Sequence, residues 1–119
     1  MTPDEVGALS ASPLIDIGSH GLSHANLIAL PRPVVDAEAC AARETLERVT
    51  GQPVLSFSYP FGFCDEAASA AVVAAGYAVA CEFGGAVRST TDRHHYGRLL
   101  VRDWSASLLE ASMHQYLST

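Results

Sequence analysis

Short apolar segments alternate with helical patterns along most of this chain, and this order constrains the fold more than any single motif. Four apolar runs predict short strands, and helical patterns stand before, between and after them. Strands that alternate with helices indicate parallel pairing with right-handed crossovers, so we predict an α/β fold. The expected strands are 14–17, 54–57, 77–81 and 99–101; the expected helices are 2–10, 33–49, 65–75 and 105–117, with loops at 19–30 and 82–96.

The helix boundaries carry their own signals. Thr2, Pro3 and Glu5 read as a cap, a first-turn proline and the acid of a capping box. Gly51 is a typical terminator for the longest helix, and Asp65 is a typical cap for the next one. We expect one face of the 33–49 helix to be apolar and the charged residues to lie mostly outside it. The apolar positions are Val34, Val35, Ala39, Ala42, Leu46 and Val49, and the charged ones are Arg43, Glu44, Glu47 and Arg48.

The length of the chain does not decide whether the sheet closes into a barrel. The 119 residues correspond to one domain and suffice to bury a core. A complete parallel (β/α) barrel usually needs ~250 residues, so the expected strands make up about half of one. The pattern therefore allows either an open sheet complete in itself or part of a larger barrel.

Charge and composition exclude several classes of partner. The net charge is −6, from 7 Arg against 13 acidic residues, and the chain has no lysine. A basic nucleic-acid footprint and a polybasic membrane patch are both missing from the sequence. No apolar run approaches the ~18 residues of a membrane span. The start of the chain, Met1 to Glu5, is acidic and polar, unlike a signal peptide, and the sequence does not indicate a cellular location.

The cysteines do not form a recognisable framework. The three cysteines are odd in number, and long, irregular gaps separate Cys40, Cys64 and Cys81. This spacing disfavours a disulfide scaffold and a zinc ribbon. We interpret all three as reduced or buried small residues.

A pair of histidines directly follows the first expected strand. His20 and His24 are four residues apart, and on one face of a helical turn both imidazoles can reach one cation. Gly21 stands where the glutamate of an HExxH protease motif would be, so that class is excluded. Neutral imidazole suits zinc and similar divalent ions. The alternative is that both are ordinary surface or core histidines.

A turn with a proline and aromatic residues follows the second expected strand. In Tyr59-Pro60-Phe61-Gly62, backbone amides can point at a developing oxyanion. The alternative is a tight turn with packed aromatics. Active sites of α/β folds sit at the carboxyl ends of strands, where both of these loops fall.

Together the two loops resemble a known family. Residues 15–27, with His20 and His24, resemble the second motif of the polysaccharide deacetylases, the NodB-homology or carbohydrate esterase family 4 domain. Residues 57–62 resemble the third motif. The spacing between the motifs, the segment 74–80 and the arginine-containing tail 96–103 are also similar to that family. The resemblance covers nearly the whole chain.

The resemblance implies a metal-dependent hydrolase that removes acetyl groups from N-acetylated sugars, on a distorted (β/α)7 barrel. His20 and His24 match the two histidine ligands of a divalent metal, for which zinc is expected. The backbone amide of Phe61 matches the oxyanion contact of the family. Tyr59 and Pro60 match positions that shape the substrate-binding groove.

The sequence departs from the family pattern in its acidic motif. The first motif of the family is an Asp-Asp pair that supplies the catalytic base and the third metal ligand, and no Asp-Asp pair occurs here. Asp16, in the strand before the histidines, matches an acidic position that is not the base. We therefore expect a C-terminal part of such a domain with little activity by itself. The alternatives are a non-catalytic metal- or carbohydrate-binding remnant and an α/β interaction module.

The sequence also departs from the family pattern at the arginine of the third motif and at the histidine of a motif near the C-terminal end of the domain. Ser58 stands where the third motif often carries arginine, and Arg98 is the expected replacement from the last strand. The late Leu-x-His motif has no clear match, and His94, His95 and His114 are candidates by residue type only, or else ordinary exposed histidines. Half a barrel also leaves sheet edges open, so we expect self-association or pairing with a missing N-terminal half.

Overall fold

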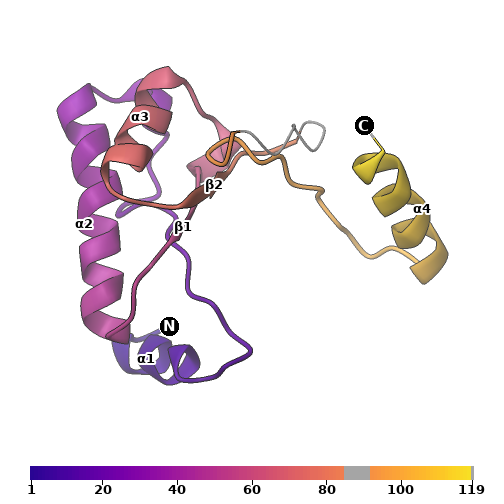
Figure 1. Ribbon diagram of the computed structural model, residues 1–119, viewed down its shortest axis with the longest axis horizontal. Helices are drawn as coiled ribbons and strands as arrows, with labels where there is room; N and C mark the ends of the chain where they lie inside the picture. Colours follow the sequence, from indigo (N-terminus) through magenta and orange to yellow (C-terminus); the bar gives the residue numbers. More distant parts are fainter. Residues whose placement is uncertain (85–91, 119) are drawn as a thin grey trace.

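The computed structural model describes residues 1–84 and 92–118, and its elements alternate much as the sequence predicts (Figure 1). The expected loop at 19–30 contains one short 3-10 helix, and the turn after the second strand forms another. The expected loop at 82–96 lies partly outside the described residues. The helices are α1 (Pro3–Ser10), α2 (Arg32–Thr50), α3 (Glu66–Ala74) and α4 (Ala106–Leu117), the 3-10 helices are η1 (Leu27–Ala29) and η2 (Pro60–Gly62), and the strands are β1 (Ser56–Ser58) and β2 (Val79–Cys81).

A small parallel sheet organises the fold. β1 and β2 pair in parallel, with Phe57 opposite Ala80, and α3 forms the crossover between them. Ser19 adds a parallel bridge to Phe57 on one side, and Tyr96 adds another to Cys81 on the other. The predicted α/β class with parallel pairing is therefore confirmed, although the described residues do not close into a barrel.

Two of the expected strands, 14–17 and 99–101, do not form. In the segment 14–17, Leu14 is 93% exposed and no residue is in a strand; pairing begins later, at Ser19. The segment 99–101 is also not a strand, because Tyr96 and Arg98 make the bridges instead. Apolar runs need a neighbour to become strands, since their stabilisation comes from cross-strand pairs and burial. Within the described residues these two runs lack such a neighbour.

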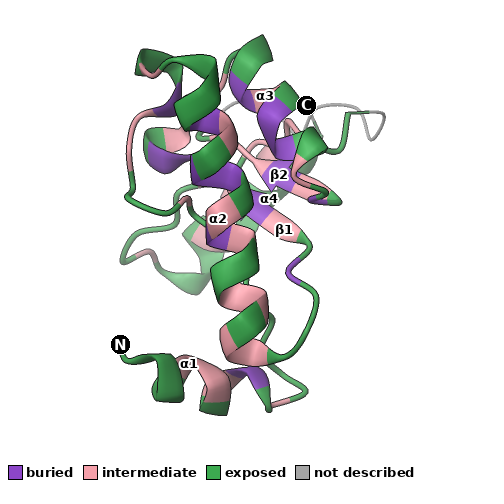
Figure 2. Cartoon of the chain, turned by 90° about the vertical axis from the view of Figure 1, so that its left-hand side faces the viewer, coloured by how far each residue is buried: buried purple, intermediate pink, exposed green. Residues whose placement is uncertain are grey.

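The core lies between the sheet and the two helices α2 and α3 (Figures 1 and 2). Its largest fully buried side chains are Tyr59, Phe57 and Leu27. Aromatic rings pack against one another in this core: the ring centroid of Phe57 lies 5.3 Å from that of Tyr59 and 5.0 Å from that of Tyr77. These edge-on and tilted arrangements are favourable ring geometries. The remaining members of the core are Val35, Ala39, Val54, Ala68, Ala71, Val72 and Ala80.

The α2 helix follows its predicted pattern with two corrections. Gly51 ends it in a left-handed conformation with φ of 67°, as expected. Val34, expected on the apolar face, is 44% exposed. Arg43, expected outside, is half-buried: its Nε donates to the Val54 carbonyl at 3.0 Å, and its NH1 donates to the Ala75 carbonyl at 2.7 Å. A guanidinium carries enough N–H donors to bond carbonyls of two separate segments simultaneously, here the segment before β1 and the end of α3.

The two terminal helices differ in their packing. α1 has the complete capping box of Thr2 and Glu5 and packs near the end of α2. α4 begins after Ser105, the first residue of the expected 105–117 helix, whose hydroxyl caps the helix by accepting from the Leu108 amide. α4 buries no residue, and it lies apart from α2 and α3 (Figure 1). Within the described ranges, no helix has both the length and the apolar character needed to span a membrane.

Candidate active site

The histidine pair lies on an irregular loop, and the expected helical turn is wrong. His20 directly follows the bridged Ser19, and the chain then reverses through Gly21, with φ of 81°, and His24, with φ of 59°. These left-handed residues are incompatible with a continuous right-handed turn. The loop nevertheless places the two rings together, with centroids 4.8 Å apart. Both histidines are exposed, so the pair faces solvent.

A buried carboxylate fixes this loop. Glu38, on α2 and 7% exposed, accepts hydrogen bonds from the Leu22 amide at 2.8 Å, the Ser23 amide at 2.9 Å and the Ser23 hydroxyl at 2.5 Å. Burial alone would raise the pKa of Glu38, but the bonds from Ser23 and Leu22 outweigh it and hold the pKa below its usual value of 4.5. Glu38 is therefore ionised at neutral pH and ties the histidine loop to the core helix.

The orientation of the His20 ring leaves one nitrogen available. His20 Nδ1 lies 2.6 Å from the Ser58 carbonyl oxygen, and it donates its proton there because a carbonyl only accepts. The Nε2 atom then carries the free lone pair. Metal-binding histidines are commonly held in this way, with the second ring nitrogen bonded to a backbone carbonyl. Two imidazoles so placed fit a divalent transition metal of the zinc type.

The turn of η2 lies against the histidines. The Phe61 ring packs edge-on to the His24 ring, with centroids 4.8 Å apart. Phe61 has φ of 59°, an uncommon conformation for a residue with a side chain. Its N–H donates no hydrogen bond within the described residues. An unpaired amide beside a candidate metal pair is available to a ligand oxygen.

Two other expected site residues lie beneath the surface. Tyr59 is 0% exposed and belongs to the core, and its hydroxyl donates to the His94 carbonyl at 3.1 Å. Burial raises the pKa of the Tyr59 phenol, which stays protonated. Pro60 is also buried. Both residues support the turn from below rather than present side chains to solvent.

Arg98 shares an opening with His20. A pocket of about 390 Å³ is lined by His20, Arg98, Ser58 and Cys81, together with their neighbours along β1. The Arg98 Nε donates to the Glu82 carbonyl at 3.3 Å, which holds the guanidinium near this opening. Asp16 lies elsewhere, in a different pocket with Leu14.

The family assignment follows from comparison with known proteins. The family model described as polysaccharide deacetylase matches residues 1–80, which contain both motifs. This chain belongs to the polysaccharide deacetylase family. The resemblance of the two motifs is thereby confirmed at the level of the family.

Solved structures share the fold of this deacetylase-family chain. A polysaccharide deacetylase from Bacillus cereus has a TM-score of 0.80 at 21% identity, over 94% of this chain and 36% of its own. A de-N-acetylase from Aggregatibacter actinomycetemcomitans has a TM-score of 0.79 at 19% identity, over 93% of this chain and 52% of its own. A Streptococcus pyogenes deacetylase, solved with acetate, has a TM-score of 0.75 at 15% identity, over 81% of this chain and 43% of its own.

The matches cover only part of each solved structure. This deacetylase-family chain spans about a third to a half of the length of those three structures. At such identities they establish the fold alone. No curated protein matches the sequence as a relative.

Among the described residues, no third metal-ligating side chain groups with His20 and His24. Within residues 1–84 and 92–118, a group of three or more metal-ligating side chains occurs elsewhere, at Cys64, Glu82 and His95. A catalytic zinc usually has three protein ligands and water. A zinc of that kind at the histidine pair would need a further ligand beyond those of the described residues.

The sequence alone did not identify several polar side chains that the structure of this deacetylase-family chain brings into close contacts. Glu38 had a usable signal: it interrupts the apolar stripe of α2 between Val35 and Ala39, where an acid is buried only if it is bonded. Cys64 and Glu82 had no such signal, since their spacing fits no motif, and His95 was a candidate by residue type only. All three cysteines are free, as expected; Cys40 is exposed, and Cys64 and Cys81 are half-buried.

Proposed function

We propose that this chain carries part of the active site of a metal-dependent deacetylase that hydrolyses acetamido groups of N-acetylated sugars. The observation that carries the proposal is the His20–His24 pair, with centroids 4.8 Å apart, beside the Phe61 amide, which has no hydrogen-bond acceptor among the described residues. The same family matches across both motifs, which supports this chemistry. The proposal extends to a (β/α)7 barrel completed by residues outside this chain.

The roles of the residues follow from their chemistry. His20, through Nε2, and His24 would hold a divalent metal, with zinc the expected ion. Such an ion polarises an amide carbonyl and lowers the pKa of a bound water. The Phe61 N–H would donate to the acetyl oxygen as negative charge develops there. Arg98 would add positive charge at the same opening.

Two parts of the site would come from elsewhere. The sequence holds no Asp-Asp pair, so the catalytic base and third ligand are not supplied by that motif. General base catalysis is worth about 10²–10⁴-fold in rate, so the chain alone is expected to be slow. This same observation favours a second candidate function, a non-catalytic module that binds metal or carbohydrate.

Acetate release tests the proposal. The chain would be incubated with zinc and an N-acetylglucosamine oligomer, and acetate would be quantified for the wild type, His20→Ala, His24→Ala and the control His114→Ala on α4. We expect slow, zinc-dependent release that the two loop variants abolish and the control retains. Release that is indifferent to chelators and to both loop variants would refute the proposal. Zinc and oligomer binding without acetate release would favour the binding module.

A further inference from the structure

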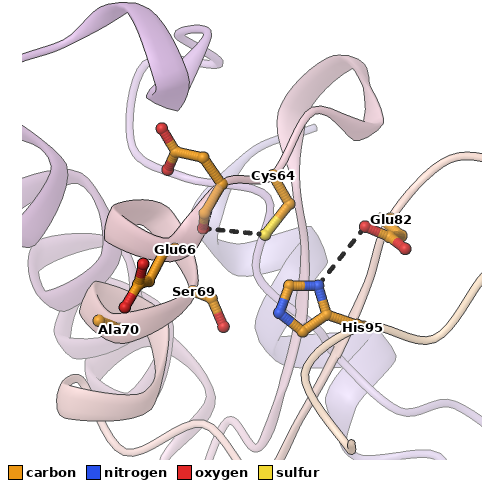
Figure 3. A pocket seen from close by; sticks show the side chains of 7 residues that line it. Cys64, Glu66, Ser69, Ala70, Glu82 and His95 are labelled. Carbon is orange, nitrogen blue, oxygen red and sulfur yellow. Dashed lines mark hydrogen bonds and ion pairs between the residues drawn. The ribbon is translucent and has the colours of Figure 1, made fainter.

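Three side chains with metal-ligating atoms converge away from the histidine pair. The Cys64 sulfur, a Glu82 carboxylate oxygen and a His95 ring nitrogen all lie within 4.8 Å of one another. Figure 3 shows them pointing toward a common space from three segments of the chain. Each side chain is half-buried. The pocket that they line shares no residue with the pocket at His20.

Backbone pairing holds the three segments in place. Glu82 directly follows β2, and its amide donates to the Tyr96 carbonyl at 2.9 Å, which fixes the neighbouring His95. The Phe83 amide donates to the Gly62 carbonyl at 3.2 Å, which ties the end of β2 to the turn just before Cys64. The three ligating residues are therefore held by a sheet edge and a turn instead of a free loop.

The separations are close to those of a metal centre. His95 Nδ1 lies 3.5 Å from Glu82 Oε2. Ligand atoms around a tetrahedral zinc, at bond lengths of ~2.0–2.3 Å, are about 3.3–3.6 Å apart. The histidine and glutamate already match this spacing. The widest separation in the cluster needs to close by about 1 Å, which a side-chain rotation can supply.

Neighbouring acids add to the suitability for a cation. The second ring nitrogen of His95, Nε2, lies 3.8 Å from Asp92 Oδ2, which is beyond hydrogen-bond distance but places a further negative charge beside the cluster. The carboxylates of Glu82, Asp65 and Asp92 place negative charge around the Cys64 sulfur, and a bound cation would offset that charge.

We propose that Cys64, Glu82 and His95 bind a zinc ion, at a site separate from the His20–His24 pair. Sulfur and imidazole select zinc over magnesium and calcium, which take oxygen ligands. On binding, the Cys64 thiol releases its proton to solvent and the thiolate sulfur bonds to the metal, with no change in oxidation state. The fourth position faces the pocket of about 480 Å³ and takes water.

Cobalt titration of the whole chain reports on the sulfur ligand directly. Co²⁺ bound by a thiolate gives a near-ultraviolet charge-transfer absorption, which coordination by imidazole alone does not produce. We expect this absorption in the wild type, in the double variant H20A/H24A and in the control Cys40→Ser, whose thiol is exposed. We expect Cys64→Ser to lose it. No absorption in the wild type, or its persistence in Cys64→Ser, would overturn the proposal.

Zinc affinity gives a second measurement that does not depend on the cysteine variant. In the H20A/H24A background, competition with a chelator would measure zinc binding at this site alone. His95→Gln should weaken it by more than about tenfold, while His114→Gln should leave it unchanged. Equal affinity in both variants would overturn the assignment. Circular dichroism in the absence of metal confirms that each variant is folded.

Discussion

The helices α3 and α4 have similar local signals but different surroundings. Asp65 caps α3 by accepting from the Ala68 amide, and Ser105 caps α4 by accepting from the Leu108 amide. α3 buries three residues against α2 and the sheet, whereas α4 buries none. Both helices therefore carry the local signal of a helix start, but only a packing partner turns the apolar side chains of a helix into core.

The largest effect is expected at the centre of the packed region. Phe57 is 2% exposed and lies between the rings of Tyr59 and Tyr77. Phe57→Ala should lower the free energy of unfolding by about 3–5 kcal/mol, because it removes buried contacts and leaves a cavity. Urea denaturation checks this. The control Phe63→Ala, at a position 51% exposed, should change stability by no more than about 0.5 kcal/mol.

Within α3 the expected effect is smaller but clear. Val72 is 0% exposed. Val72→Ala should lower the free energy of unfolding by about 1.5–3 kcal/mol, because less apolar surface is removed from water on folding. A loss as small as that of an exposed residue, measured by the same denaturation, would remove the contrast between α3 and α4.

The buried acid of α2 gives the next prediction. Glu38→Gln should lower stability at pH 7 by about 1–3 kcal/mol, since charge-assisted hydrogen bonds from Leu22 and Ser23 are lost. The exposed Glu44→Gln, on the same helix, is the matched control and should be near neutral. Thermal unfolding of the two variants side by side decides the matter. Equal stability would mean that Glu38 does not anchor the histidine loop.

The same carboxylate predicts a dependence on pH. The pKa of Glu38 is lower in the folded chain than its usual 4.5, so its stabilisation is complete above that value and is lost as the pH falls through the folded pKa. The stability gap between the wild type and Glu38→Gln should therefore shrink in acid. Denaturation curves between neutral and strongly acidic pH measure it; a gap that widens in acid would reverse the assigned sign.

The smallest effect is expected on α4. Met113 is 47% exposed, and Met113→Ala should change the free energy of unfolding by no more than about 0.5 kcal/mol. A larger loss that grows with protein concentration would instead show that α4 is covered by a second copy. Light scattering on the same samples tests the expected self-association directly.

Much of the fold was predictable because its signals are local. The cap at Thr2, the terminator Gly51 and the cap Asp65 all define helix ends in the structure as expected. The strand ends were less predictable. The run 14–17 is as apolar as a strand, yet pairing with Phe57 occurs only at Ser19, because cross-strand hydrogen bonds depend on a neighbour that local sequence does not specify.

The proximity of His20 and His24 was predictable from the sequence, but the geometry that brings them together was not. The four-residue spacing of His20 and His24 was interpreted as a helical turn, whereas the loop brings the rings together through left-handed residues anchored by Glu38. The cluster of Cys64, Glu82 and His95 depends on tertiary pairing between segments far apart in the sequence, and no spacing rule reveals it.

Zinc-edge anomalous diffraction from crystals of the chain grown with zinc would test the central claim most directly. The account predicts an anomalous peak within bonding distance of His20 Nε2 and a ring nitrogen of His24. It also predicts that His24→Ala removes this peak while the peak at Cys64 remains. Crystals with zinc at Cys64 and no peak at the histidine pair would contradict the proposed deacetylase site.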